Sequence, residues 1–573
     1  MTDSPLLDAD GPVTVEILSS GNRIPDTVEI HAVRTRSELN RVAEAVIILG
    51  DGNPATQEFP VTDGDEFKPG SEIEIKAGYA NQPQSIFKGI VTSVRLRIDG
   101  TSGSRLEVTC RHHAAVLLQG RRRTVFEAGK SDSELISEVA NAAGISVDVE
   151  STGVTLPAFV RFDVSDWDFI VNRADVNGLV VACTESGLTI GAPDYGSRPN
   201  IEVTYGEDLI AIDMEVSVLG QFAEFHTSAW DPAKQELEII EAKSASDNTY
   251  GDLKTETLAK VLHPESASFA SSAFHDNSAL SAYAKARATR ADLAKIQGWV
   301  AFQGNASLMT NSVLALSALG NRFSGNGLIG GVLHRIESGN WKTEVQFGLP
   351  ADWIADKSGI SAPAASAVTG GARGLVIGKV TKLDKDPDRL SRIQVVIPEF
   401  DQGVTPVWAR LGSSYATNGS GCMFLPEVDD EVIVGFLNDN PSAAVVLGSL
   451  HNPKATPPQG FVDYDKANNT KAIVSREQIK VTFDEEKKAL TLETPAGNKM
   501  EIDDDGGVVK LSDQNGNTAT LHGDGITLDS ASDVVIKAAG NIAITAAGNL
   551  KMSGVDVSAD GSAGFTANGR RIG

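Results

Sequence analysis

AAGNIAITAAGNLKMS, residues 538–553, repeats nearly the same eight-residue phrase twice. The preceding stretches SASDVVIK (530–537) and HGDGITLD (522–529) fit the same frame, with two apolar positions separated by one residue. Such a pair, followed by Gly, Asn or Asp, predicts one short strand and one turn per octad, with one face of the strand turned inward. The predicted turn glycines are Gly540 and Gly548. The predicted inward side chains are Ile526, Leu528, Val534, Ile536, Ile542, Ile544, Leu550 and Met552.

One pair of inward side chains cannot form a core alone, so each octad must stack on neighbours. These neighbours come either from successive coils of a single-chain β-helix or from two further copies of the chain around a threefold axis. A calcium-binding nonapeptide helix would need G-G-x-G-x-D-x-U-x, and AAGNIAIT has neither the double glycine nor the aspartate. The period alone leaves one chain and three chains open.

Length and composition favour a multidomain β protein. The 573 residues predict three or four domains, and 55 glycines with only 6% aromatic residues favour many turns. The net charge of −26 argues against binding nucleic acid or an anionic membrane surface. The three cysteines lie far apart and predict no disulfide framework. Neither a secretory signal nor an apolar run of ~20 residues is visible, so we expect a chain made in the cytoplasm without a signal peptide.

The pattern along the chain changes from module to module. Residues 13–110 alternate apolar and polar with period two, which predicts antiparallel strands. Helices are predicted at 131–144, where Ser131 and Glu134 form a capping box, at 165–178 and at 277–297. A hairpin is predicted at 330–348 and a small barrel at 375–450, with LVIGKVTKL, RIQVVIP, TPVWARLG, CMFLP, DEVIVGFL and SAAVVLGSL as its strands.

No motif predicts catalytic, cofactor-binding or metal-ligating residues. GNGLIGG (325–331) has the letters of a dinucleotide loop, but a strand-like sequence follows it, so a glycine-rich turn between strands is expected. The carboxylate clusters at 382–392 and 502–507 lack the spacing of a calcium loop. The histidines, His226 among them, form no H-x-H or H-x-x-x-H pair, although folding could still bring scattered ligands together.

The segment FLPEVDDEVIVGFLNDNPSAAVVLGSLHN (424–452) resembles the OB-fold signature of VgrG-type central spike proteins, which occur in type VI secretion, phage baseplates and extracellular contractile injection systems. FDVSDWDFIVNRADVNGL (162–179) is similar to the hub region of that family, and LTLETPAGNKMEIDDD (490–505) to the entry of its spike. The residues that carry the OB signature are Pro426, Glu427, Asp430, Glu431, Val432, Pro441 and Gly448.

The resemblance implies a mainly β fold in five parts: a hub of two tandem tube-like β-barrels with inserted helices (1–357), a linker (358–374), an OB-fold barrel (375–450), a linker and neck (451–489) and an intertwined trimeric β-helix spike (490–573). It implies a homotrimer that caps a hexameric tail tube and punctures a target envelope. The implied partners are other baseplate proteins, a PAAR-type tip protein and possible effector cargo. The implied location is a phage tail-like particle, released or driven into target cells on firing.

Two other readings stay open. Only about 35 residues separate Leu450 from the spike, too few for a folded enzyme, so a structural role is expected. The first alternative is nevertheless a spike with unrecognised cell-wall-degrading activity. The second is a secreted adhesin with a single-chain β-helix, which would not explain the OB signature.

Overall fold

The computed structural model describes residues 3–569 except 7–10, 102, 232–233, 244–249, 263–265, 272–276, 358–359, 362–363, 402–404, 462–465 and 567. The chain is mainly β, as predicted, and divides into two compact units, Met1–Gly371 and Ala372–Gly573. The predicted linker and neck fall partly outside the described residues. None of the described helices is long and apolar enough to cross a membrane.

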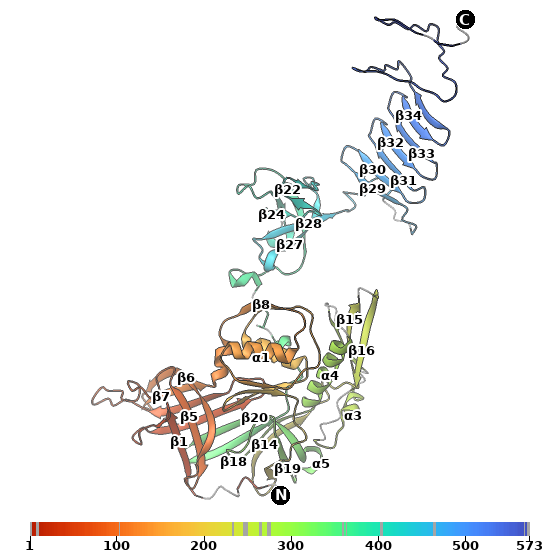
Figure 1. Cartoon of the computed structure of the whole chain (residues 1–573). Helices are drawn as coiled ribbons and strands as arrows, with labels where there is room; N and C mark the ends of the chain where they lie inside the picture. The colour runs from red at the N-terminus through yellow and green to blue at the C-terminus, as the bar shows by residue number, and fades with distance from the viewer. Residues whose placement is uncertain are drawn as a thin grey trace. The chain divides into compact units, whose positions relative to one another are not determined.

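A large sheet dominates the first unit (Figure 1). Its strands are, in sheet order, β14 (Leu209–Val216), β18 (Ile296–Gln303), β21 (Asn340–Phe347), β20 (Gly325–Glu337), β3 (Ile30–Glu38), β4 (Glu44–Gly50), β7 (Gly103–Arg111), β6 (Gln84–Asp99), β5 (Glu72–Tyr79), β1 (Val13–Ser19) and β2 (Asn22–Arg23), with β19 (Val313–Ser317) against β20 and β13 (Glu202–Thr204) against β19.

The sheet joins two sets of strands that are far apart in sequence. β20 pairs antiparallel with β3, and Ile336 lies opposite Val33 at this seam. The strands β1–β7 enclose one apolar core, with Ile47 and Val108 fully buried, and β18–β21 enclose another around Val300. These strands therefore form one sheet with two separate cores, in the region where the resemblance implies two tandem barrels.

Two capped helices form a third core in the first unit. α1 (Asp132–Ala142) begins with the predicted capping box of Ser131 and Glu134, and α2 (Asp166–Asp175) begins at Ser165, whose hydroxyl accepts a hydrogen bond from the Asp168 amide. Their apolar faces pack with one another and with the nearby strands. Those strands are β8 (Arg122–Phe126), β9 (Val147–Val149), β10 (Phe159–Val164), β11 (Val180–Thr184) and β12 (Gly187–Gly191).

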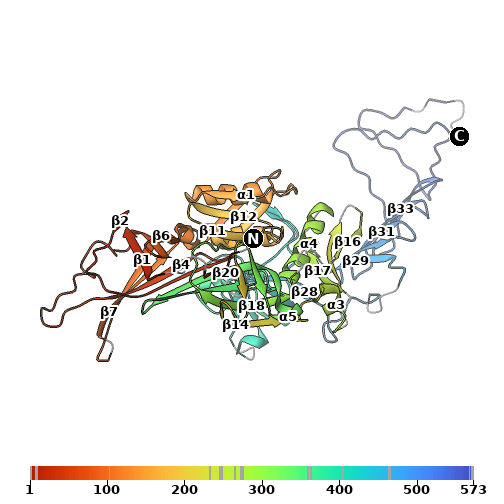
Figure 2. The same cartoon turned by 90° about the horizontal axis from the view of Figure 1, so that it is seen from below.

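A small sheet lies against the longest helix, α4 (Asn277–Leu293), as Figures 1 and 2 show. In it, β15 (Glu224–Asp231) is central, between the antiparallel β16 (Glu236–Lys243) and the parallel β17 (Ser266–Ser271). The helix was predicted to reach 297 but ends at Leu293, because the chain enters β18 at Ile296. The short helices α3 (Thr255–Ala259) and α5 (Gly320–Phe323) complete this part.

The prediction of a glycine-rich turn at GNGLIGG is wrong, because the stretch lies inside β20. Its glycines are required by close packing. A Cβ on Gly327 would come within 2.6 Å of the Phe347 ring, and one on Gly330 within 2.4 Å of the Gly348 carbonyl oxygen. Strand glycines commonly mark such close approaches.

The second unit begins with a closed five-stranded barrel made by β22 (Val376–Lys382), β23 (Arg392–Val396), β24 (Val407–Leu411), β28 (Ala444–Leu450) and β27 (Glu431–Phe436). Val380, Val395 and Val446 are fully buried in its core. The predicted strand CMFLP is wrong, because residues 422–426 have no strand conformation and Met423 and Phe424 point to solvent. Before it, β25 (Ala416–Thr417) and β26 (Ser420–Gly421) form a short hairpin.

A seven-stranded antiparallel meander, here called the ladder, follows the barrel. Each of its strands has five residues, and each pairs with the next along the chain. The strands are β29 (Thr470–Val474), β30 (Lys480–Asp484), β31 (Ala489–Glu493), β32 (Lys499–Asp503), β33 (Val508–Ser512), β34 (Thr518–His522) and β35 (Gly525–Asp529).

Candidate functional site

The candidate site is one face of the ladder, which carries two columns of apolar side chains. Strands β30 to β35 each contribute two residues at positions i and i+2, and the register aligns them across every strand pair. We call these twelve side chains the ladder face. The first column is Val481, Leu492, Met500, Leu511, Ala519 and Leu528; the second is Phe483, Leu490, Ile502, Val509, Leu521 and Ile526.

The opposite side of the same strands is polar. Because side chains alternate along a strand, the residue between each apolar pair points the other way. These residues form a single column of Thr482, Thr491, Glu501, Lys510, Thr520 and Thr527. The sequence therefore builds a sheet that is made to meet water on one side and apolar surface on the other.

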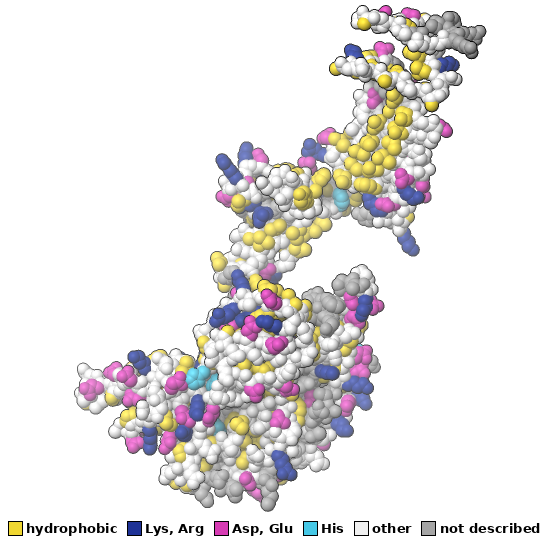
Figure 3. All heavy atoms as spheres, in the orientation of Figure 1, with side chains coloured by type: hydrophobic (Ala, Val, Ile, Leu, Met, Phe, Trp, Pro, Cys, Tyr) yellow, Lys and Arg dark blue, Asp and Glu magenta, His cyan; other side chains and the backbone are white. Residues whose placement is uncertain are grey.

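The ladder face is open in the single chain. Leu492, Leu511 and Leu521 are 41%, 51% and 46% exposed. A shallow, largely apolar groove of about 630 Å³ runs along the first column, and Figure 3 shows the hydrophobic side chains as a continuous band along the ladder. Contiguous apolar surface of this kind marks an interaction site in a soluble protein. The geometry offers a surface for assembly, since no group on it is a nucleophile or a general base.

The predicted inward residues of the octads fall into two groups. Ile526 and Leu528 lie on β35 and belong to the ladder face. The other six, Val534, Ile536, Ile542, Ile544, Leu550 and Met552, lie beyond β35 and are between 53% and 70% exposed. Bends at 531–532, 539–540 and 547–548 recur every eight residues, with Gly540 and Gly548 in two of them.

The prediction of one strand per octad is wrong for the single chain beyond Asp529. Among the described residues after β35, none is in a strand. The physical reason is that a strand needs a hydrogen-bonded partner and a buried face, and these octads have neither within their own chain. The octad period survives as the spacing of the bends.

Ten of the twelve residues of the ladder face were missed by the sequence reasoning. The signal was present, because VTF (481–483), LTL (490–492), MEI (500–502), VKL (509–511) and ATL (519–521) share the apolar pair of ITL (526–528). Turns of two to five residues separate these strands, so a template with a fixed period of eight does not align with them.

The predicted OB signature residues all lie on β27, on β28 or on the turns next to them. The Glu427 amide donates to the Asp430 carboxylate at 2.8 Å, which closes the turn before β27, and Glu431 accepts from the Asn452 side chain at 2.9 Å. Pro426 and Val432 are buried, and Gly448 pairs with Ile433 in the barrel. Pro441 lies in the turn between β27 and β28.

A hydrogen-bonded cluster ties the ladder to the octad that follows it, residues 530–537. The Asp513 carboxylate accepts from the backbone amides of Asn515 and Asn517 and from both of their side chains at 2.8–3.2 Å. These bonds, the Asn517 side-chain bond above all, lower the pKa of Asp513 to about 2. The side-chain Oδ1 atom of Asn517 in turn accepts from the Ser530 hydroxyl and the Ala531 amide, both at 2.9 Å. The chain just after β35 is therefore held beside the turn between β33 and β34.

Comparisons with known protein families give two matches. Residues 9–338 match the family model of the Alg8 N-terminal domain. Residues 376–451, which span the closed barrel, match the type VI secretion system and phage-baseplate injector OB domain. The second match confirms the resemblance to VgrG-type spike proteins at the barrel that carries it. No curated protein matches the chain.

Solved structures with a similar course of the chain come from tails and injectors. A 43 kDa prophage tail protein from Shewanella oneidensis is 10% identical, with 59% of this chain and 98% of that one covered at a TM-score of 0.46. An E. coli component of the type VI secretion system is 12% identical, with 76% of this chain and 100% of that one covered at a TM-score of 0.41. A chain of a Francisella PdpA–VgrG complex is 10% identical, with 91% of this chain and 80% of that one covered at a TM-score of 0.40. At these identities and TM-scores the likenesses do not bear on function.

Proposed function

Because the chain belongs to the family of the Alg8 N-terminal domain and carries an injector OB domain, we propose that it is the central spike and hub of a contractile injection device. It acts as a homotrimer. The observation that carries this proposal is the open, two-column ladder face, on the strands that come next after the OB barrel in the chain.

In the proposed trimer, three ladder faces meet on one axis. Each strand of five residues is about 17 Å long, and this length is the width of one ladder. Three ladders form the sides of a prism whose interior holds the paired apolar columns. The Thr, Glu and Lys column of the opposite side then faces solvent. The octads continue the same arrangement, because their pairs repeat the i and i+2 spacing of the ladder.

The free energy favours this association. A half-exposed Leu, Ile or Val gains about 1 kcal/mol when its remaining surface is buried. Over the seven exposed side chains of the ladder face and the six of the octads, the gain is roughly 13 kcal/mol for each chain. That value is comparable to the ~4–15 kcal/mol that association costs in lost freedom of motion.

A single-chain β-helix would use these residues differently. Its coils would stack inside one chain and cover their own apolar pairs, whereas the ladder is an antiparallel meander with a bare apolar face. Three copies supply the missing cover, and we therefore favour the trimer over the adhesin hypothesis.

The partners follow from this role. The hub, with two strand sets per chain and six per trimer, caps a hexameric tail tube and contacts other baseplate proteins. A PAAR-type protein sharpens the tip, and effector cargo travels with the particle. The device is phage tail-like, and contraction drives the spike into the envelope of a target cell. Penetration is mechanical and needs no cleavage of the cell wall by this chain. A peptidoglycan turbidity assay tests this proposal, and sustained clearing by the purified chain would refute it.

Electron microscopy of the purified protein tests the proposal. We expect particles with threefold symmetry that carry a hub and one thin shaft. Class averages without a threefold axis would refute it.

A further inference from the structure

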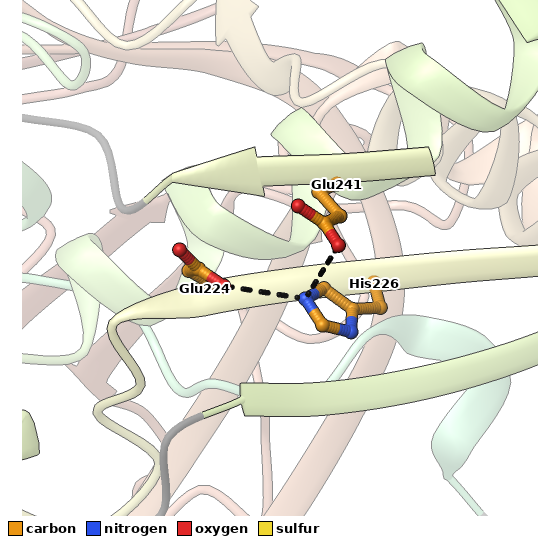
Figure 4. A group of neighbouring side chains, drawn as sticks. All are labelled: Glu224, His226 and Glu241. Atoms are coloured by element: carbon orange, nitrogen blue, oxygen red, sulfur yellow. Dashed lines mark hydrogen bonds and ion pairs between the residues drawn. The ribbon is translucent and has the colours of Figure 1, made fainter. Parts of the chain in front are cut away.

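A side-chain cluster on the small sheet of the first unit has the geometry of a metal site. Glu224 and His226 point the same way from β15, and Glu241 lies directly opposite His226 on β16. Figure 4 shows one ring nitrogen of His226 facing both carboxylates. One ligand atom from each of the three residues lies within 4.8 Å of the other two.

The distances suit coordination better than hydrogen bonding. The Nε2 atom of His226 makes a long hydrogen bond of 3.5 Å to Glu224 Oε2 and lies 3.7 Å from Glu241 Oε1, and both distances exceed the ~2.7–3.2 Å of an ordinary N–H···O bond. Two ligands bound to one ion at ~2.1 Å, at a tetrahedral angle, lie about 3.4 Å apart. The three atoms therefore already stand near the corners of a coordination polyhedron.

Another histidine of the chain provides a comparison. The Nε2 atom of His113 lies 2.8 Å from a carboxylate oxygen of Glu72, which is an ordinary charge-assisted hydrogen bond to a single carboxylate. His226 differs from it in facing two carboxylates, both at longer distance.

The packing of β15 on α4 fixes the backbone on either side of His226. The inward neighbours of His226, Phe225 and Thr227, are buried beneath the sheet, and the Thr227 hydroxyl donates to the Leu280 carbonyl oxygen on α4 at 2.7 Å. The His226 side chain is 23% exposed and that of Glu241 is 65% exposed, so an ion can enter from solvent.

We propose that Glu224, His226 and Glu241 bind a divalent transition-metal ion, with Zn²⁺ as the ion that we would test first. One imidazole nitrogen and two carboxylate oxygens suit Zn²⁺ and its neighbours better than Ca²⁺ or Mg²⁺, which prefer oxygen alone. Three protein ligands leave a fourth position for water or for a group from another molecule. The bound ion links β15 to β16 and so stiffens the edge of this sheet.

The sequence could not reveal this site from spacing. Glu224 and His226 form only an E-x-H pair, and Glu241 follows fifteen residues later. The register of β15 with β16 brings the third ligand opposite His226.

Calorimetric titration of the tag-free, chelator-treated full chain with ZnCl₂ tests the proposal. The wild type is expected to bind one more equivalent than His226→Ala, and Glu241→Gln is expected to bind Zn²⁺ at least about tenfold more weakly. Glu241 is exposed, so this amide substitution leaves the fold intact, which circular dichroism checks. His113→Ala is the matched control and should bind as the wild type does.

A second measurement uses Co²⁺, whose visible absorption reports its ligands. We expect a Co²⁺ spectrum in the wild type and in His113→Ala that is missing in His226→Ala. Equal uptake of Zn²⁺ by the wild type and His226→Ala, or no uptake by the wild type, would overturn the assignment.

Discussion

Replacing Leu511 with Asp is the sharpest perturbation of the ladder face. Leu511 lies in the first column between Met500 and Ala519, and it is 51% exposed in the single chain. In the proposed trimer, three copies of this side chain lie around the axis. The substitution leaves the fold of one ladder unchanged, because the position is open to water in the single chain.

The expected loss of trimer stability is large. Removing the remaining burial of Leu511 costs about 1 kcal/mol per chain, or about 3 kcal/mol per trimer. Each Asp also places an unpaired carboxylate against apolar surface, which costs several kcal/mol per charge. The total is more than about 10 kcal/mol, and each 1.4 kcal/mol is a factor of ten in the association constant. The milder Leu511→Ala loses only the first amount and should weaken assembly by roughly a hundredfold.

Sedimentation equilibrium over a range of concentrations measures this loss. Leu511→Asp is expected to sediment as the 60.4 kDa chain and Leu511→Ala to dissociate on dilution. Thr520→Asp is the matched control, since Thr520 lies in the polar column on the opposite side and its substitution should leave the trimer intact. The reasoning is refuted if Leu511→Asp stays trimeric, or if Thr520→Asp dissociates to the same extent.

Three further predictions concern other parts of the chain. Replacing Ile542 and Ile544 together with Asp should abolish the trimer or prevent assembly of the device, and wild-type assembly seen by electron microscopy would disprove their inward orientation. Burial lowers the pKa of His334 to about 4, so the unfolded chain takes up the proton first as the pH falls. The free energy of unfolding should therefore fall by roughly 1.4 kcal/mol for each pH unit from about 6.5 down to 4. Urea midpoints at pH 7.5 and 5 measure this fall, and His334→Gln should show a shallower dependence on pH. Asp132→Asn removes the bidentate carboxylate partner of the buried Arg173, and should cost about 3–5 kcal/mol in urea unfolding of the first unit, whereas an unchanged midpoint would contradict this.

Local chemistry was predictable from the sequence where it depends on a few adjacent residues. The capping box of Ser131 and Glu134 satisfies free amides at a helix start, whatever the rest of the chain does, and it lies where the pattern predicts it. The strands of the barrel were predicted for the same reason, since alternation marks the buried face. CMFLP was mispredicted because its apolar residues point outward.

Features that depend on distant partners were not predictable. The glycines of β20 look like a turn until Phe347 is seen to occupy the space that a side chain would need. The proposed metal ligand Glu241 lies beside His226 only because of the register between β15 and β16. The ladder face was missed because its turns vary in length while its apolar pairs do not.

Native mass spectrometry of the wild-type chain tests the central claim most directly. Three copies of 60.4 kDa give about 181 kDa, and this is the mass that the account predicts at micromolar concentration. A single species of 60.4 kDa under the same conditions would contradict it.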